Sequence, residues 1–175
     1  SYSNMQLHNF YNTNSYLPIL NGSILADLVI LFIVYYTPYF DSFFLKKWYE
    51  TYRLSAVIAD VLILVIGFIL TRAVFTYFNW SWNFYLFLAV ILIIQIIHDI
   101  LFALFFLTVP KGTNKMLDLF KSYSKEAGIN AILGDSFMIV ITVIFAYLFS
   151  MFSFNTNIIA LIVFSYLIPY IIYTK

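Results

Sequence analysis

The chain has 175 residues, of which 63% are hydrophobic and only 10% are charged, and its formal net charge is +1. Soluble domains are about 45–50% apolar and about 25% charged, and a chain this short cannot hide so much apolar surface in one water-soluble core. The composition therefore predicts an integral membrane protein. The small net charge argues against nucleic-acid binding, and the absence of cysteine excludes disulfides and thiolate chemistry.

Five apolar stretches approach the length of about 20 residues that a membrane-spanning helix needs. They do not alternate polar with apolar residues, so we expect an all-α helical bundle rather than a barrel. The predicted spans are residues 24–40, 54–78, 84–109, 131–154 and 158–173. They follow a polar N-terminal tail (1–22) and form a single transmembrane domain (23–175). Pro38 and Pro169 predict a kink or an early end in the first and last spans.

The first span carries Asp27 near its predicted outer end, where we expect the carboxylate to reach water. Two N-x-S sequons, at Asn21 and Asn79, lie almost against the bilayer. A glycan-adding enzyme would have little room there, so we expect neither to be used.

The distribution of Lys and Arg predicts the orientation. Eight of the nine fall on one side of a five-span arrangement: Lys46, Lys47, Arg53, Lys111, Lys115, Lys121, Lys125 and Lys175. The positive-inside rule puts this side in the cytoplasm and the N-terminus outside or in a lumen. Arg72 lies toward the other side, where its side chain can snorkel to the interface. Trp48, Trp80 and Trp82 are expected at the two interfaces.

The longest connection, residues 109–130, opens with the turn signal Pro-Lys-Gly at residue 110. Apolar residues then recur at helical spacing, which predicts a short amphipathic helix over residues 115–127 on the cytoplasmic interface. Such a helix either packs over the bundle as a surface helix or docks onto lipid headgroups or another protein.

Three predicted spans each bring a carboxylate into the inner half of the membrane. A rise of about 1.5 Å per residue places Asp60, Asp99 and Asp135 roughly 9, 13 and 8 Å from the cytoplasmic edge. Small and hydroxyl residues share the faces of Asp60 and Asp135, which predicts that these faces pack inward. The predicted intramembrane polar cluster is Arg53, Asp60, Gln95, His98, Asp99 and Asp135. His98 and Asp99 are adjacent, so we expect them to diverge on a helix.

Three roles fit this cluster. The carboxylates could hydrogen-bond to neighbouring side chains and tie the bundle together, act as a proton or cation relay, or hold a metal ion with His98. One histidine without a metal-binding array is a weak metal signal, and no phosphate-binding loop or nucleophile elbow is present. We therefore expect no enzyme activity, no cofactor and no metal. A membrane-embedded enzyme acting on lipid at the cytoplasmic face is the weakest alternative.

Three segments carry a family resemblance: "WYETYRLSAVIADVLILVIGFILTR" (48–72), "QIIHDILFALFF" (95–106) and "VPKGTNKMLDLFKSYSKEAGINAILGDSFMI" (109–139). They resemble a small hydrophobic membrane protein shared among nucleocytoplasmic large DNA viruses, the giant-virus group. The resemblance covers about half the chain and contains the polar cluster.

The resemblance implies a structural protein, a membrane-embedded minor capsid protein that ties the inner virion membrane to the capsid. That membrane would derive from the host endoplasmic reticulum during assembly. The basic loops, residues 46–53 and 111–125, would contact anionic headgroups or neighbouring capsid proteins, and the N-terminal tail could contact further partners. The resemblance implies no catalytic residue. The alternative is a small ion or proton channel or transporter that uses the Asp cluster.

Overall fold

The computed structural model describes residues 7–39 and 42–174, and its regular elements in these ranges are helices. A 3₁₀ turn, η1 (Thr13–Ser15), precedes α1 (Tyr16–Tyr36), α2 (Phe43–Tyr52), α3 (Leu54–Tyr77), α4 (Phe84–Thr108), α5 (Lys115–Ala127), α6 (Ile129–Ser150) and α7 (Phe154–Ile172). Five of them, α1, α3, α4, α6 and α7, are long and apolar enough to cross a membrane. The protein is an all-α, multi-pass membrane protein, as its composition predicts.

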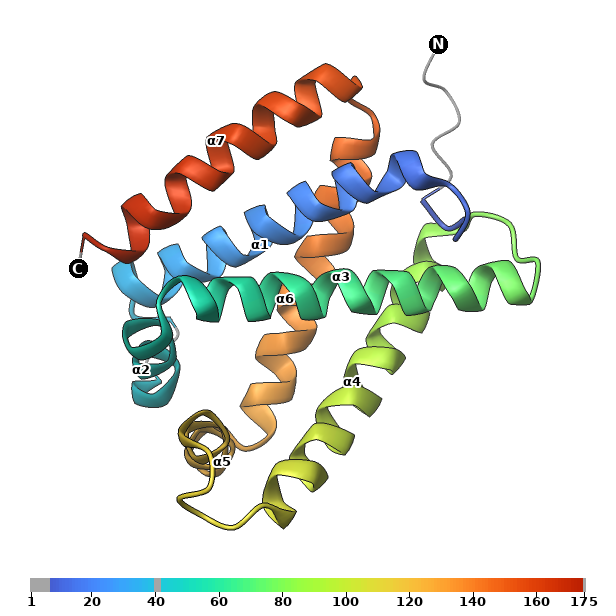
Figure 1. Ribbon diagram of the computed structural model, residues 1–175. Coiled ribbons are helices and arrows are strands. Elements are labelled where there is room, and N and C mark those ends of the chain that lie inside the picture. Colours follow the sequence, from blue (N-terminus) through green and yellow to red (C-terminus); the bar gives the residue numbers. More distant parts are fainter. Residues whose placement is uncertain (1–6, 40–41, 175) are drawn as a thin grey trace.

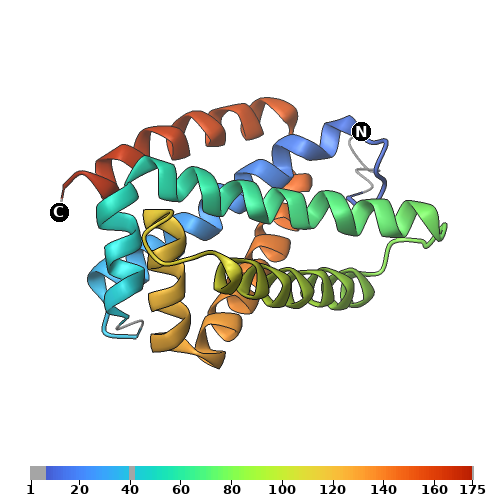
Figure 2. The ribbon, with the colours of Figure 1, turned by 60° about the horizontal axis from the view of Figure 1, so that its bottom comes forward.

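Helix α1 lies at the centre of the molecule. It packs most extensively against α6, and it also contacts α3 and α7, while α4 contacts both α3 and α6. Figures 1 and 2 show α7, α1 and α3 lying along similar axes, with α3 running opposite to the other two, and Figure 1 shows α6 crossing behind α1 and α3. The short helices α2 and α5 contact each other beside the ends of the long helices.

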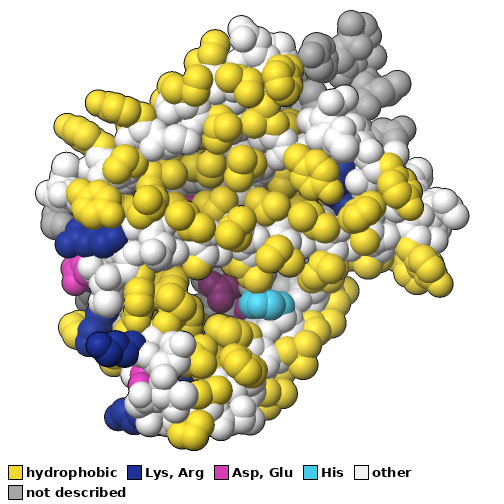
Figure 3. Space-filling model, in the orientation of Figure 1, with side chains coloured by type: hydrophobic (Ala, Val, Ile, Leu, Met, Phe, Trp, Pro, Cys, Tyr) yellow, Lys and Arg dark blue, Asp and Glu magenta, His cyan; other side chains and the backbone are white. Residues whose placement is uncertain are grey.

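The two ends of the molecule differ in what they carry. Figure 1 shows the start of α1, the α3–α4 connection and the α6–α7 connection on one side, and α2, α5 and the end of α7 on the other. Most Lys side chains belong to α2 and α5, and Figure 3 shows them gathered along that edge. The arrangement agrees with an odd number of crossings and a basic layer at one end.

Helix α1 begins earlier than predicted. The predicted span starts at Ile24, because Asn21, Gly22 and Ser23 are polar or small, but the helix starts at Tyr16. The polar side chains are tolerated because each finds a partner: Ser23 Oγ donates to the Ile19 carbonyl at 2.9 Å, and Asn21 is bound by α7. The predicted polar tail therefore ends at residue 15 rather than at residue 22.

Asp27 consequently lies in the middle of α1 instead of near its outer end. Its side chain is 0% exposed, so the prediction that it reaches water is wrong. At the other end, the helix stops at Tyr36 and Thr37 is extended, as the clash with the ring of Pro38 requires. Pro169 does not end α7 at once, since that helix continues to Ile172.

Close packing of α1 on α6 depends on Gly22. A Cβ atom at this position would come within 2.5 Å of the backbone nitrogen of Ala146. The inward face predicted for α6 is confirmed, since Met138, Thr142 and Ala146 are buried. Small residues allow membrane helices to approach closely and gain dispersion energy over their length.

A pair of buried amides joins α1 to α7. Asn21 Nδ2 donates to the backbone carbonyl of Asn157 at 2.8 Å and to its side-chain oxygen at 3.0 Å. Asn157 Nδ2 in turn donates to the Phe149 carbonyl at 2.9 Å, near the end of α6. Asn21 is fully buried, which leaves no room for a glycan there, whereas Asn79 is exposed in the α3–α4 turn.

Candidate functional site

The five helices α2 to α6, together with Ile30 of α1, surround a cavity of about 600 Å³. Its floor comes from the two short helices, through side chains such as Trp48 of α2 and Phe120 of α5, whose rings lie 4.9 Å apart. Its walls come from α3, α4 and α6, and most of the lining is apolar. Figure 3 shows acidic and histidine side chains within a hollow on the face toward the viewer, surrounded by hydrophobic surface.

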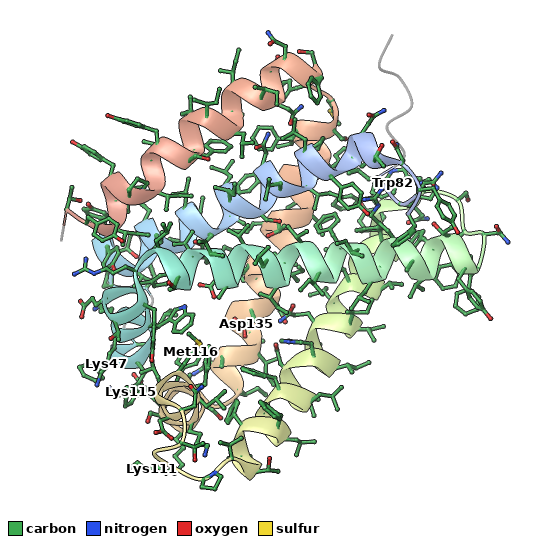
Figure 4. All side chains as sticks on the ribbon, viewed as in Figure 1. Lys47, Trp82, Lys111, Lys115, Met116 and Asp135 are labelled. Atoms are coloured by element: carbon green, nitrogen blue, oxygen red, sulfur yellow. The ribbon has the colours of Figure 1, made fainter. Side chains whose placement is uncertain are left out.

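Five of the six residues of the predicted polar cluster line this one cavity. They are Asp60 of α3, Gln95, His98 and Asp99 of α4, and Asp135 of α6. Figure 4 shows Asp135 on α6, at the centre of the space bounded by α3, α4 and α5. Three helices therefore direct carboxyl groups into the same enclosed volume.

Arg53, the sixth predicted member, does not belong to the described lining. Its backbone adopts φ 49°, which ends α2 and turns the chain into α3. From there its Nη1 donates to the Ile172 carbonyl at 2.7 Å, and its guanidinium lies 5.6 Å from the Tyr173 ring centroid. The prediction was wrong because the helix break redirects Arg53 toward the end of α7.

The carboxyl of Asp60 is held by the floor of the cavity. Trp48 Nε1 donates to Asp60 Oδ2 at 3.2 Å, and its side chain is only 5% exposed, so its ring packs inside the protein. The Tyr49 hydroxyl interacts with Asp60 and donates to Asp27 Oδ1 at 3.0 Å. A chain of polar groups thus leads from the cavity through Tyr49 to the centre of α1.

Asp99 is bound within its own helix. Gln95 Nε2 donates to Asp99 Oδ1 at 2.7 Å, as their i,i+4 spacing allows. His98 Nδ1 lies 3.2 Å from the same oxygen, so the expectation that these neighbours diverge is wrong. The imidazole is long enough to turn back along the helix. Asp99 Oδ2 remains buried without a hydrogen-bond partner.

Asp135 has no hydrogen-bond donor among the described residues, although its side chain is half-buried in the protein. The part of its surface that stays accessible faces the cavity. A carboxyl group removed from water needs a proton, a cation or several donors to offset its desolvation. Asp135 is therefore the group most open to a ligand.

Two tyrosine hydroxyls border the acidic groups from the floor. Burial, and then the nearby Asp27 and Asp60, raise the pKa of Tyr49 well above its ordinary value. Burial, and then Asp135 and Asp60, raise the pKa of Tyr123 in the same direction. Both hydroxyls therefore keep their protons at neutral pH and can donate hydrogen bonds.

The carboxylates surround the cavity rather than converge on one point. In residues 7–39 and 42–174, no three His, Asp or Glu side chains are placed to share a metal ion. No Lys or Arg is found among the described lining residues either. The arrangement therefore suits a positively charged ligand larger than a single chelated ion, or protons.

The first predicted basic loop, residues 46–53, lies mostly in a helix, and the second contains the helix that was predicted there. Lys46 and Lys47 belong to α2, while Lys115, Lys121 and Lys125 belong to α5, whose bounds match the predicted amphipathic helix. Lys111 precedes α5 in a turn. The reason is local: Ser42 and Asn114 cap the two helices by accepting from the Leu45 and Leu117 amides.

Arg72 makes a structural contact that sequence reasoning missed. It was expected to snorkel to the interface, but its side chain is 0% exposed. Its Nη2 donates to the carbonyls of Asn9 and Asn12, and its guanidinium lies 4.6 Å from the Tyr16 ring centroid. The segment before α1 folds over the helix end and covers the guanidinium.

Family models, curated proteins and solved structures were compared with this chain. None matches. The resemblance to a giant-virus membrane protein therefore stays a prediction, and the acidic cavity is the strongest guide to function.

Proposed function

We propose that this protein is a membrane-embedded channel or transporter for protons or other cations, with the acidic cavity as its binding site. The observation that carries the proposal is the Asp135 carboxyl, which faces the cavity without a hydrogen-bond partner among the described residues. Asp60 and Asp99 line the same cavity and add negative charge to it.

The energetics favour a functional cluster over a purely structural one. A carboxyl that ties helices together would use its oxygens, whereas Asp99 Oδ2 and Asp27 Oδ2 are buried without partners, and the Asp135 carboxyl has none. Placing such groups in a membrane costs a few kcal/mol each, even on lenient scales. Sequences keep groups this costly where they bind or move charge.

The polar chain beside the cavity supports proton movement. Tyr49 carries a proton and contacts both Asp27 and Asp60, so it can donate to one while accepting from the other. A proton bound in the cavity thereby gains a path toward the buried centre of α1. Intramembrane carboxylates in such chains are typical of proton relays.

Proton flux in proteoliposomes tests the proposal. Wild-type protein is reconstituted with a pH-sensitive dye inside the vesicles, and a proton gradient is applied. We expect Asp135→Asn to lower the flux at least about tenfold, because the group that receives the proton is lost. Glu50→Gln is the matched control, since Glu50 is an exposed carboxylate of α2 outside the described lining.

The melting temperature of Asp135→Asn separates the two roles. The change removes a half-buried carboxyl without a hydrogen-bond partner, so the variant should melt at or above the wild-type temperature. Wild-type flux in a stable variant would contradict the transport proposal. A lower melting temperature would support the structural role instead.

The second candidate is the membrane-embedded minor capsid protein. It is supported by the basic layer of α2 and α5, which offers Lys47, Lys111 and Lys115 on one exposed face. Such a layer suits anionic headgroups or acidic surfaces of a capsid protein. Photo-crosslinkers at these lysines, in infected cells, should capture capsid proteins, whereas a crosslinker at Asn79 on the opposite end should not. Equal capture from both ends would contradict this candidate.

A further inference from the structure

The chemistry of the cavity narrows the class of cation that it takes. Its volume of about 600 Å³ falls in the range of small-molecule sites, roughly 300–1,000 Å³, and is far larger than a dehydrated inorganic ion needs. Most of the lining is apolar, with aromatic rings from Trp48, Phe102 and Phe120 close to the carboxyl groups. A ligand that fills such a space has a hydrocarbon part as well as a charge.

The opening of the cavity faces hydrocarbon. On α4, the lining residues Ile100 and Leu104 are also exposed on the outside of the bundle. The side chain of His98 at the rim is 40% exposed. Figure 3 shows the hollow opening through a surface of hydrophobic side chains. A ligand therefore reaches the acidic groups sideways from the bilayer.

The hydrogen-bonding needs of the carboxyl groups match an ammonium group. A primary ammonium carries three N–H donors and no acceptor. The Asp135 carboxyl has no donor, and Asp60 and Asp99 stand on the neighbouring walls. Aromatic faces such as that of Trp48 also attract ammonium groups, more strongly where water is excluded.

We infer that the cavity binds a lipid-soluble amine, a protonated primary amine on a hydrocarbon chain, that enters from the membrane between α3 and α4. The ammonium lies against the Asp135 carboxyl, with Asp99 and Asp60 on the neighbouring walls, and the chain extends toward the opening. The inference rests on the proposed function, because it names the cation that the acidic site accepts.

Photolabelling in phosphatidylcholine nanodiscs tests the inference. The probe is a twelve-carbon amine with a diazirine on its chain, and the comparison probe is the alcohol of the same length. We expect the amine to label peptides of α3, α4 and α6 saturably, in competition with unlabelled dodecylamine, and the alcohol to label them at background. Asp135→Asn should lower the labelling at least about tenfold, while Glu50→Gln should leave it unchanged.

Dodecyltrimethylammonium provides a second measurement that needs no variant. It keeps the charge but has no N–H donor, so it should compete much more weakly than dodecylamine. Equal labelling by amine and alcohol, or unchanged labelling of a folded Asp135→Asn protein, would overturn the inference. If labelling fails while Asp135-dependent proton flux persists, the amine is wrong and the transport proposal stands. If labelling succeeds without any flux, the binding site stands and transport falls.

Discussion

The buried polar residues of this protein fall into two groups with different energetics. The Asn21 amide nitrogen donates to Asn157, and the Ser23 hydroxyl donates to the Ile19 carbonyl of its own helix, so these donors join or complete helices at little cost, although Asn21 Oδ1 is buried without a partner. Asp99 keeps one oxygen, and Asp135 its whole carboxyl, without a donor among the described residues, and both line the cavity. The first group explains the packing, and the second marks the site.

Gly22 tests how closely α1 and α6 must approach. Gly22→Ala would bring a Cβ to 2.5 Å from the Ala146 nitrogen, so the two backbones must separate. Overpacking of this kind costs about 1–3 kcal/mol, and we expect a clearly lower melting temperature in detergent. Gly67→Ala is the control, since its Cβ would meet only side-chain atoms at 3.7 and 3.9 Å and should be nearly neutral. Equal melting of the two variants would contradict the close approach.

At the scale of elements, the two short helices act as one unit that closes the cavity. Both oxygens of Glu126, near the end of α5, accept from backbone amides at the start of α2, from Phe43 at 2.9 Å and from Phe44 at 3.1 Å. A carboxylate at a helix N-terminus also interacts favourably with the helix dipole. The contact holds α5 against the start of α2, and the two helices together form the floor of the cavity.

Glu126→Gln should loosen this floor. A neutral amide accepts through one oxygen only and loses the charge–dipole attraction, so the amides of α2 should exchange with deuterium several-fold faster. Hydrogen exchange with mass spectrometry measures this difference. Glu50→Gln removes a charge from α2 but keeps the contact between Glu126 and the α2 amides, so it should leave the exchange rate unchanged. Identical exchange rates for Glu126→Gln and wild type would show that Glu126 does not stabilise the start of α2.

The segment before α1 should respond to pH through His8. Burial, and then the charge of the neighbouring Arg72, lower the pKa of His8 below its ordinary value of 6.5. The folded segment therefore favours neutral His8, so its stability is full above pH 6.5 and is lost as the pH falls through the lowered pKa. The effect is small because the ring is partly exposed.

Hydrogen exchange of residues 7–15 measures this pH dependence. Protection should fall between pH 7.5 and pH 5, after correction for the intrinsic exchange rate. In a His8→Phe variant, which keeps an aromatic ring beside Trp82 without a titrating group, protection should not change over this range. A pH response that survives in His8→Phe would assign it to another group.

At the scale of the whole molecule, basic residues and short turns lie at opposite ends. The α2–α5 layer carries the lysines, whereas the α3–α4 turn near Asn79 carries no charge. The positive-inside rule predicts that the basic layer faces the cytoplasm.

Single cysteines test this orientation cleanly, because the natural chain has none. With a membrane-impermeant maleimide on intact cells, Asn79→Cys should react and Lys47→Cys and Lys115→Cys should not. In inverted vesicles the pattern should reverse. Labelling of Lys47→Cys and Asn79→Cys from the same side would contradict the five-span topology.

Much of this architecture follows from composition and spacing. Apolar length predicts the five spans, and the bounds of α3, α4 and α5 agree closely with those expected. The helical spacing of small residues predicts the inward face of α6, and the depth of three Asp residues predicts that they share a level. These features are local, because each depends on residues within one helix and on the lipid around it.

Tertiary structure decided the features that depend on partners far along the chain. Asn21 could enter α1 only because Asn157 satisfies its amide, and that contact moved the helix start and buried Asp27. The backbone of Arg53 turned its side chain away from the acids, and the N-terminal segment covered Arg72. The free energy of a buried polar group depends on the donors and acceptors that the fold brings to it, and residue order alone does not specify them.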